Sequence, residues 1–240
     1  MPISQHLKTM NINYYQQHKF ISNSTLTQFS GYLYGGFKVP NLQIAFDFGN
    51  LVDAMLTSPE LIDFDENDLY CEDGRVIHFE QEDINRAQAM ARSLQDDPIF
   101  AGIFPYMKKQ HAFYRTNFQF DYDGLKFTLP MRCKMDGVKL GSMGADVKTT
   151  NTKSQHDFNH HMEILDYDRQ GSLYMDMAKI DKMIYFAVSK KPDKRDTFKV
   201  FHFTIERGDR AYLRGRDKYN RLAFYYYTMI HNFNTKKLAT

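Results

Sequence analysis

The stretch HAFYRTNFQFDYDGLKFTLPMRCKMDG, residues 111–137, constrains the fold more than any other part of the chain. Aromatic and apolar residues alternate with polar ones on both sides of Asp123-Gly124. Alternation with a period of two is typical of a strand with one buried face, and Asp-Gly favours a tight hairpin turn. We therefore predict two long antiparallel strands, which begin a sheet that other elements must cover.

Helices are expected before this hairpin, and both strands and helices after it. Upstream, helices are predicted over 22–30, 45–56, 82–94 and 98–109, with a loop at Gly35-Gly36 and Pro40 and a short strand at 75–79. Downstream, we expect a strand at 145–149, a helix at 166–179, strands over MIYFAVSK and TFKVFHFTIE, and a long basic and aromatic helix at 208–231. This order predicts an α/β fold with a central mixed sheet flanked by helices.

The bulk properties fit a single globular domain. The chain has 240 residues, 42% hydrophobic and 25% charged, without repeats or a linker. We expect one domain over 1–240: an N-terminal helical part to about 109, a sheet core at about 110–206 and a C-terminal basic helix at about 208–233. No apolar run is long enough for a membrane span, and the first 17 residues lack a signal-peptide core, so a cytoplasmic location is expected. Two cysteines are too few for a disulfide framework or an all-cysteine metal site.

Charge is unevenly distributed, although the formal net charge is only +2. Residues 190–221 contain eleven basic and five acidic residues, whereas residues 60–83 are acidic. Such a distribution favours one face that binds a polyanion, and a solvated surface is the alternative interpretation.

Two acids and a lysine converge in MRCKMDGVKLGSMGADVKTT, residues 131–150. On a strand, Asp146 and Lys148 share one face, and a turn through 137–144 can bring Asp136 beside Asp146. Carboxylates bind Mg²⁺ or Mn²⁺, and such a cation activates water and offsets charge on a phosphate. Lys148 would position or deprotonate that water, or stabilise the transition state. Taken alone, the Asp-x-Lys pattern is a weak signal that occurs by chance in many proteins, and it favours a surface ion pair.

Two further features accompany this group. Gln170 and Tyr174 are four residues apart and therefore share one face of the expected helix. Upstream, FGNLVDAML contains a single acid, Asp53, within an otherwise apolar helix.

Together these motifs resemble a known family. MRCKMD…ADVKTT followed by YDRQGSLY is similar to the RecB-like branch of the PD-(D/E)xK nucleases, and within it to the exodeoxyribonuclease VIII type. ISNSTLTQF and FGNLVDAMLTSPE also resemble the start of that family and its glycine-containing helix. The resemblance runs from about Ile21 to Met175 and implies a restriction-endonuclease-like core.

The resemblance implies roles for individual residues. Asp136, Asp146 and the Val147 carbonyl would be metal ligands, and Lys148 the catalytic lysine. Gln170 and Tyr174 would contact the DNA end or support the active site from behind.

Two positions depart from the family pattern. Asp53 stands where the family commonly has a histidine; aspartate also binds hard cations, so Asp53 is a candidate metal ligand, and a helix-surface acid is the alternative. Gln110 is the nearest match to a glutamate on the strand before the first aspartate, and an amide binds metals less well.

Several residues are candidate phosphate contacts. Thr149 and Thr150 follow the lysine directly, although β-branched residues are also common at strand ends. Arg207, Arg210 and Arg214 are spaced so that they can follow a DNA backbone, and a solvated helix face is the alternative.

The resemblance therefore implies a Mg²⁺-dependent deoxyribonuclease (Mn²⁺ as a substitute). Its expected activity is 5′→3′ exonuclease action on duplex DNA ends, which leaves 3′ single-stranded tails for phage or prophage recombination. A ring-shaped trimer or tetramer and a single-strand annealing protein as partner are expected. A structure-specific or single-strand endonuclease, and a catalytically inactive DNA-binding homologue, are the alternatives.

Overall fold

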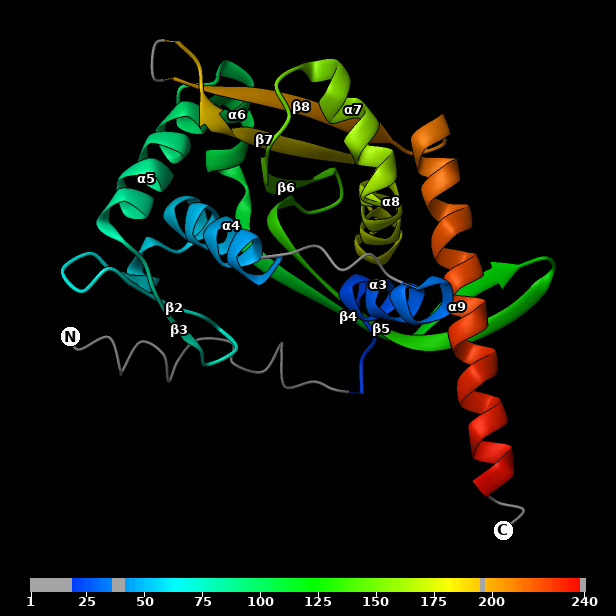
Figure 1. Ribbon diagram of the computed structural model, residues 1–240. Coiled ribbons are helices and arrows are strands. Elements are labelled where there is room, and N and C mark those ends of the chain that lie inside the picture. Colours follow the sequence, from blue (N-terminus) through cyan, green and yellow to red (C-terminus); the bar gives the residue numbers. More distant parts are fainter. Residues whose placement is uncertain (1–18, 36–41, 195–196, 238–240) are drawn as a thin grey trace.

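A five-stranded sheet forms the centre of the molecule. The computed structural model describes residues 19–35, 42–194 and 197–237, with side chains to residue 230 (Figure 1). The strands are β4 (Lys108–Tyr122), β5 (Leu125–Lys139), β6 (Met143–Thr150), β7 (Lys182–Pro192) and β8 (Phe198–Glu206), in the order β4-β5-β6-β7-β8. Only β6 and β7 pair in parallel, and the other neighbours are antiparallel. The predicted α/β class with a mixed sheet is therefore confirmed.

The hairpin predicted around Asp123-Gly124 joins β4 to β5. Asp123 and Gly124 both have positive φ, 55° and 79°. Two successive left-handed residues make the tight turn whose twist matches that of the flanking strands, and Asp-Gly accepts these angles. The long register that follows, from Tyr122↔Leu125 to Lys108↔Val138, makes β4 and β5 the most extended pair in the sheet.

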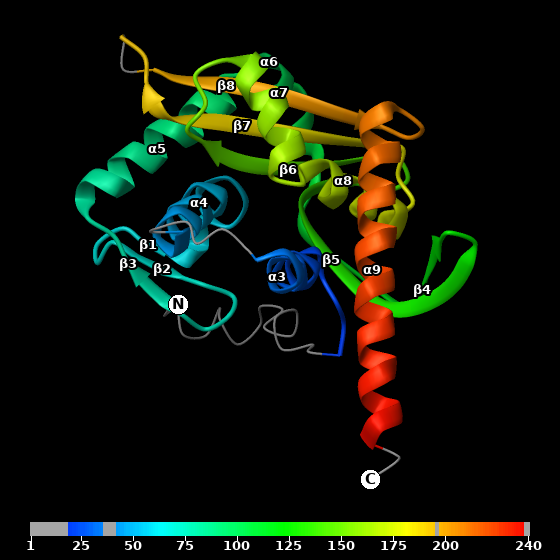
Figure 2. The ribbon, with the colours of Figure 1, turned by 45° about the vertical axis from the view of Figure 1, so that its right-hand side comes forward.

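Strands β5 and β6 stay together only briefly. They pair over Gly137↔Ala145, Val138↔Gly144 and Lys139↔Met143. Beyond that point β5 continues with β4, whereas β6 continues with β7 through eight pairs. Figure 2 shows the β4–β5 hairpin leading away from β6, β7 and β8, so the sheet is split between β5 and β6.

Helices cover both faces of the sheet. One core contains residues of α3 (Asn23–Tyr34), α8 (Tyr167–Ala178) and α9 (Arg210–Lys237) with inward residues of β4 and β5. The other contains α4 (Leu42–Thr57), α5 (Gln81–Gln95) and α6 (Pro98–Ile103) with Ala145, Val147 and Phe186. Residues that alternate along β6 and β7 thus contact different helical layers, as the period of two requires. Among the helices described, none is long and apolar enough to cross a membrane.

The structure corrects one predicted element and adds others. The helix expected over 98–109 ends at Ile103, a 3-10 turn η2 covers Phe104–Tyr106, and Lys109 lies in β4. Pro105 explains the early end, because its ring removes a donor and disfavours helical geometry at the residue before it. The acidic segment forms a small sheet of β1 (Ile62–Asp63), β2 (Asp68–Tyr70) and β3 (Val76–His78), preceded by the 3-10 turn η1 (Pro59–Leu61).

Helix α7 (Gln155–Ile164) was not predicted from the sequence. Ser154 caps it by accepting a hydrogen bond from the Asp157 amide, a signal that the sequence contained. The expected loop residues Gly36 and Pro40, and the N-terminal stretch to residue 18, lie outside the described residues.

Candidate active site

The predicted acids and lysine meet where β5 and β6 part. Asp136 directly precedes Gly137, which is the residue of β5 farthest from the β5–β6 turn that still pairs with β6. Its Oδ2 accepts a hydrogen bond from the Val147 amide at 2.7 Å. The side chain of Asp136 thus satisfies a main-chain donor of β6 at the point where main-chain pairing with β5 has stopped.

Asp146 and Lys148 lie on the same face of β6, as their spacing predicted. The Lys148 ammonium forms an ion pair with Asp146 Oδ2, and Gln170 Nε2 of α8 donates to Asp146 Oδ1 at 3.1 Å. Asp146 is only 3% exposed. Two side chains from two different elements therefore fix both oxygens of this buried carboxylate.

Two tyrosines that sequence reasoning did not assign complete the surroundings of the lysine. Lys148 Nζ lies 5.2 Å from the centroid of the Tyr167 ring, a cation–π contact. The Tyr167 ring stacks on Tyr185, whose hydroxyl donates to the Tyr167 carbonyl at 2.7 Å. Tyr167 opens the motif YDRQGSLY, so its position in the sequence was visible although its contact with Lys148 was not.

Helix α4 contributes Asp53 from the other helical layer. Asp53 Oδ2 accepts a hydrogen bond from Gln110 Nε2 at 2.9 Å, and the same nitrogen lies 3.0 Å from Thr57 Oγ1. Asp53 Oδ1 is buried and has no hydrogen-bond partner among the described residues. The two positions that depart from the family pattern therefore contact one another.

These charged groups shift one another's pKa values. Burial raises the pKa of Asp53 to about 6, the charge of Asp146 adds to this, and Lys134 and Lys148 oppose it. Burial also raises the pKa of Asp136 well above its usual range, and the charges of Asp53 and Asp146 raise it further. Burial acts to lower the pKa of Lys148, but nearby Asp146, Tyr167 and Asp136 raise it overall, so Lys148 is an ammonium.

The donor set fits a hard divalent cation. Carboxylates and main-chain carbonyls are the oxygen ligands that Mg²⁺ prefers. Within residues 19–35, 42–194 and 197–230, no group donates to the buried Asp53 Oδ1. In the described part of the chain, no three His, Cys, Asp or Glu side chains are already grouped as metal ligands. Asp53, Asp136 and Asp146 each accept a hydrogen bond from a protein donor.

The other candidate residues occupy several environments. Tyr174 is 8% exposed and belongs to the core beside the site. Thr150 is buried, and its hydroxyl lies 3.0 Å from Thr152 Oγ1. Thr149 is half-buried and faces α4, where a Cβ on Gly49 would lie 3.6 Å from its hydroxyl.

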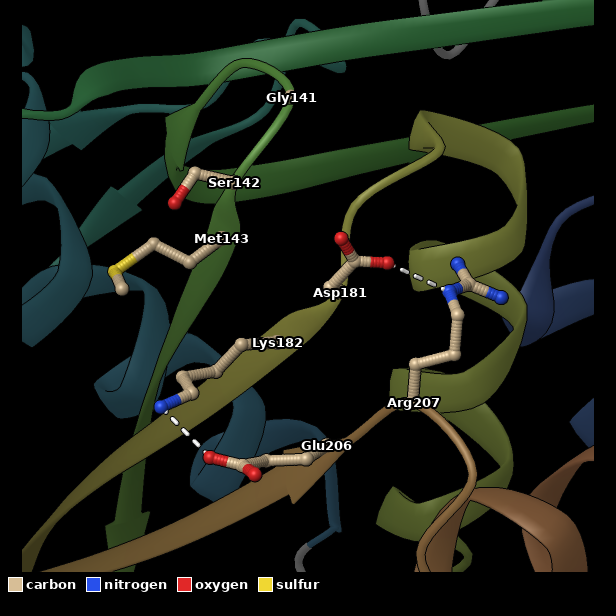
Figure 3. Close-up of a pocket in the computed structure, with 7 residues that line it drawn as sticks. All are labelled: Gly141, Ser142, Met143, Asp181, Lys182, Glu206 and Arg207. Carbon is tan, nitrogen blue, oxygen red and sulfur yellow. Dashed lines mark hydrogen bonds and ion pairs between the residues drawn. The ribbon is translucent and has the colours of Figure 1, made fainter.

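Two of the three candidate arginines are engaged by acids of this chain. Arg207 donates to Asp181 and Asp176 at 2.9 and 2.7 Å; Figure 3 shows the first of these contacts. Arg214 pairs with the fully buried Asp168 and with Glu163. Arg210 is exposed at the start of α9.

Figure 3 also shows a surface pocket between the β5–β6 turn, the start of β7 and the end of β8. Its charged residues pair with one another, as in the Lys182–Glu206 ion pair at 2.7 Å. The pocket contains none of the candidate catalytic residues.

Comparison with known proteins places the chain in a family. Residues 32–220 match the model of DUF3799, described as a PDDEXK-like domain of unknown function. The match covers more than half of the chain, so the chain belongs to this family. The expected membership of the PD-(D/E)xK superfamily and the restriction-endonuclease-like fold are thereby confirmed, and they support a nuclease.

One solved structure supports the fold. A protein from Eubacterium rectale described as a "putative exonuclease" aligns with a TM-score of 0.54 and 16% identity, over 89% of this chain and 85% of that chain. A second structure, SSO0001, aligns with a TM-score of 0.37 and 13% identity, over 93% of this chain and 84% of that chain, too low a score to support an argument. No curated protein matches the chain.

Proposed function

We propose that this protein is a metal-dependent deoxyribonuclease that hydrolyses DNA phosphodiesters with Mg²⁺, or with Mn²⁺ as a substitute. The observation that carries the proposal is the convergence of three acids and an ammonium where β5 and β6 part. Asp136 and Asp146 come from neighbouring strands, and Asp53 comes from α4. Buried carboxylates repel one another, and a cation bound among them would offset this repulsion.

Asp53, Asp136, Asp146 and the Val147 carbonyl would hold the cation. When bound, it lowers the pKa of a water molecule and offsets the charge that develops on the scissile phosphate. Lys148, an ammonium beside Asp146, donates hydrogen bonds to the attacking water or to a phosphate oxygen. Gln170 keeps Asp146 oriented, and the buried Tyr174, four residues further along α8, supports the active site from behind.

The finer activity that we propose is 5′→3′ exonuclease action on double-stranded DNA ends, which leaves 3′ single-stranded tails. Support comes from the order of motifs shared with the exodeoxyribonuclease VIII type and from the name of the Eubacterium rectale protein. Among the candidate phosphate contacts, Arg207 and Arg210 are exposed, Thr149 and Arg214 are half-buried, and Thr150 is buried. Arg207 and Arg214 would contact DNA only by giving up contacts with acids of this chain.

The proposal extends to assembly and setting. We propose that the protein is cytoplasmic and consists of one nuclease domain, which assembles into a ring-shaped trimer or tetramer. Its single-stranded product would be bound by a single-strand annealing protein during phage or prophage recombination. Light scattering after gel filtration tests the ring, and a monomer at all concentrations would exclude it.

The activity is tested with linear duplexes labelled at one 5′ or 3′ end, together with a closed circle. Each is incubated with Mg²⁺, with EDTA, and with Lys148→Ala protein. Digestion from 5′ ends that spares the circle and is lost in both controls is expected. Nicking of the circle would identify an endonuclease, and DNA binding without cleavage in Mg²⁺ or Mn²⁺ would identify an inactive homologue.

A further inference from the structure

Gln110 adopts a main-chain conformation that a residue with a side chain seldom adopts. Its φ is +48°, in the left-handed region that glycine accepts and other residues adopt only at a cost. Its neighbours pair regularly, as Lys109↔Gly137 and His111↔Met135, whereas Gln110 is absent from the register. The position opposite it in β5 is Asp136, so the irregularity lies beside the proposed metal site.

The unusual conformation carries the amide of Gln110 to α4. Gln110 Nε2 is 2.9 Å from Asp53 Oδ2 and 3.0 Å from Thr57 Oγ1. A carboxylate only accepts hydrogen bonds, so the atom facing Asp53 must be the amide nitrogen, and both of its hydrogens are then used. This bond links β4 to α4 across 57 residues of sequence.

The bond distinguishes the two oxygens of Asp53. Oδ2 accepts from the amide, whereas Oδ1 is buried and no group in the described part of the chain donates to it. A buried carboxylate oxygen without a partner is costly unless something else binds it. Gln110, which donates to Asp53, lies opposite Asp136 in the pairing of β4 with β5. The free oxygen therefore belongs to the same group of charges as the two strand aspartates.

We propose that Gln110 is a positioning residue: it holds Asp53 Oδ2 so that Oδ1 is presented to a divalent cation, and it is not itself a ligand. This inference rests on the proposed function. A neutral donor suits the position because a carboxylate there would add a fourth negative charge beside Asp53, Asp136 and Asp146. Partners that orient metal ligands in this way typically change metal affinity by about 10- to 100-fold when they are removed.

The experiment measures Mn²⁺ binding by calorimetry, without DNA. The main variant is Gln110→Gly, because glycine accepts the left-handed main chain and only the side chain is lost. Gln110→Asn is the second variant: asparagine tolerates this conformation, but its amide is one methylene shorter. Gln119→Ala, a change of an exposed glutamine on the same strand, is the matched control. Circular dichroism verifies that each variant is folded.

We expect Gln110→Gly and Gln110→Asn to bind Mn²⁺ about 10- to 100-fold more weakly than the wild type, with Gln119→Ala unchanged. If Gln110 acts through Asp53, the double variant with Asp53→Asn binds no more weakly than Asp53→Asn alone. Wild-type affinity in both Gln110 variants would overturn the inference. So would losses that add in the double variant, which would make Gln110 an independent ligand. Absence of Mn²⁺ binding in the wild type would instead refute the proposed function.

Discussion

The packing of α8 against α9 allows a sharp test through Gly215. A Cβ added to Gly215 would lie 2.1 Å from the Asp168 carbonyl oxygen and 2.4 Å from Ser172 Oγ. Ordinary carbon–oxygen contacts lie near 3.3 Å or beyond. Gly215→Ala therefore forces the two helices apart by about 1 Å, because the nearest obstacle is main chain that cannot rotate away.

The cost follows from what crosses the same interface. Overpacking of this kind costs about 1–3 kcal/mol. The Ser172 hydroxyl donates to the Tyr212 carbonyl at 2.9 Å, and losing such a bond in a buried place costs about 1–3 kcal/mol. The same displacement stretches the contacts of the buried Asp168 with Arg214 and Lys218. We expect the free energy of unfolding to fall by about 3–5 kcal/mol in total, because these losses occur at one interface and overlap.

Urea denaturation followed by circular dichroism measures the change. Gly102→Ala is the matched control: Gly102 is also helical, but an added Cβ has no heavy atom within 4 Å. Alanine there should stabilise the protein by about 0.5–1 kcal/mol through its helix propensity. The two substitutions are chemically identical and should have opposite signs. If Gly215→Ala were as stable as the wild type, the close approach of α8 and α9 would be wrong.

Three further predictions follow from other contacts. Tyr167→Leu should lower the single-turnover rate of DNA cleavage about 5- to 30-fold, because it removes the aromatic ring that contacts Lys148. Tyr167→Phe keeps the ring and should cleave at close to the wild-type rate; equal losses in both variants would refute a role for the ring. Burial raises the pKa of the Cys71 thiol to about 11, and the charge of Asp73 contributes to this. The rate of Cys71 alkylation by iodoacetamide should therefore still rise about tenfold per pH unit from 8 to 10, and a plateau near pH 9 would contradict this. Arg207→Ala should lower the free energy of unfolding by about 2 kcal/mol, because it removes the donor to the Ile180 carbonyl and the ion pairs with Asp176 and Asp181, and Arg210→Ala should not.

Much of the fold was predictable because local signals and tertiary contacts agree. Alternation around Asp123-Gly124 predicted β4 and β5, and MIYFAVSK and TFKVFHFTIE predicted β7 and β8. The helix predicted over 98–109 was too long: it begins at Pro98 but ends at Ile103. The apolar residues that follow suit a helix and a buried turn equally, and Pro105 favours the turn. Helix α7 was missed because its face against the core is short: only Phe158 and Met162 are buried within it.

Sequence spacing predicts some contacts of the candidate site and not others. Asp146 and Lys148 share a face because they are two residues apart on one strand, a fact independent of tertiary structure. The partnership of Asp53 with Gln110 is different: no periodicity links residues on α4 and β4, and the bond depends on a left-handed main chain at Gln110. The sequence also does not distinguish Arg214 from a solvated arginine, because its partner Asp168 lies 46 residues away in the chain.

The site depends on a defect in the sheet as much as on its residues. Val147 packs in the layer of α4, whereas Gln170 of α8 reaches Asp146 from the opposite layer. In a continuous sheet the main chain would separate these layers, and an acid on α4 could not lie near both strand aspartates. Because β5 leaves β6 after Gly137↔Ala145, Asp53 and Asp146 can act on Asp136 from different elements. The amide of Val147 then needs another acceptor, and Asp136 supplies it. The same split that opens the sheet therefore brings the carboxylates together, and any variant that extended β5–β6 pairing beyond Gly137 should dismantle the site while leaving all of its residues in place.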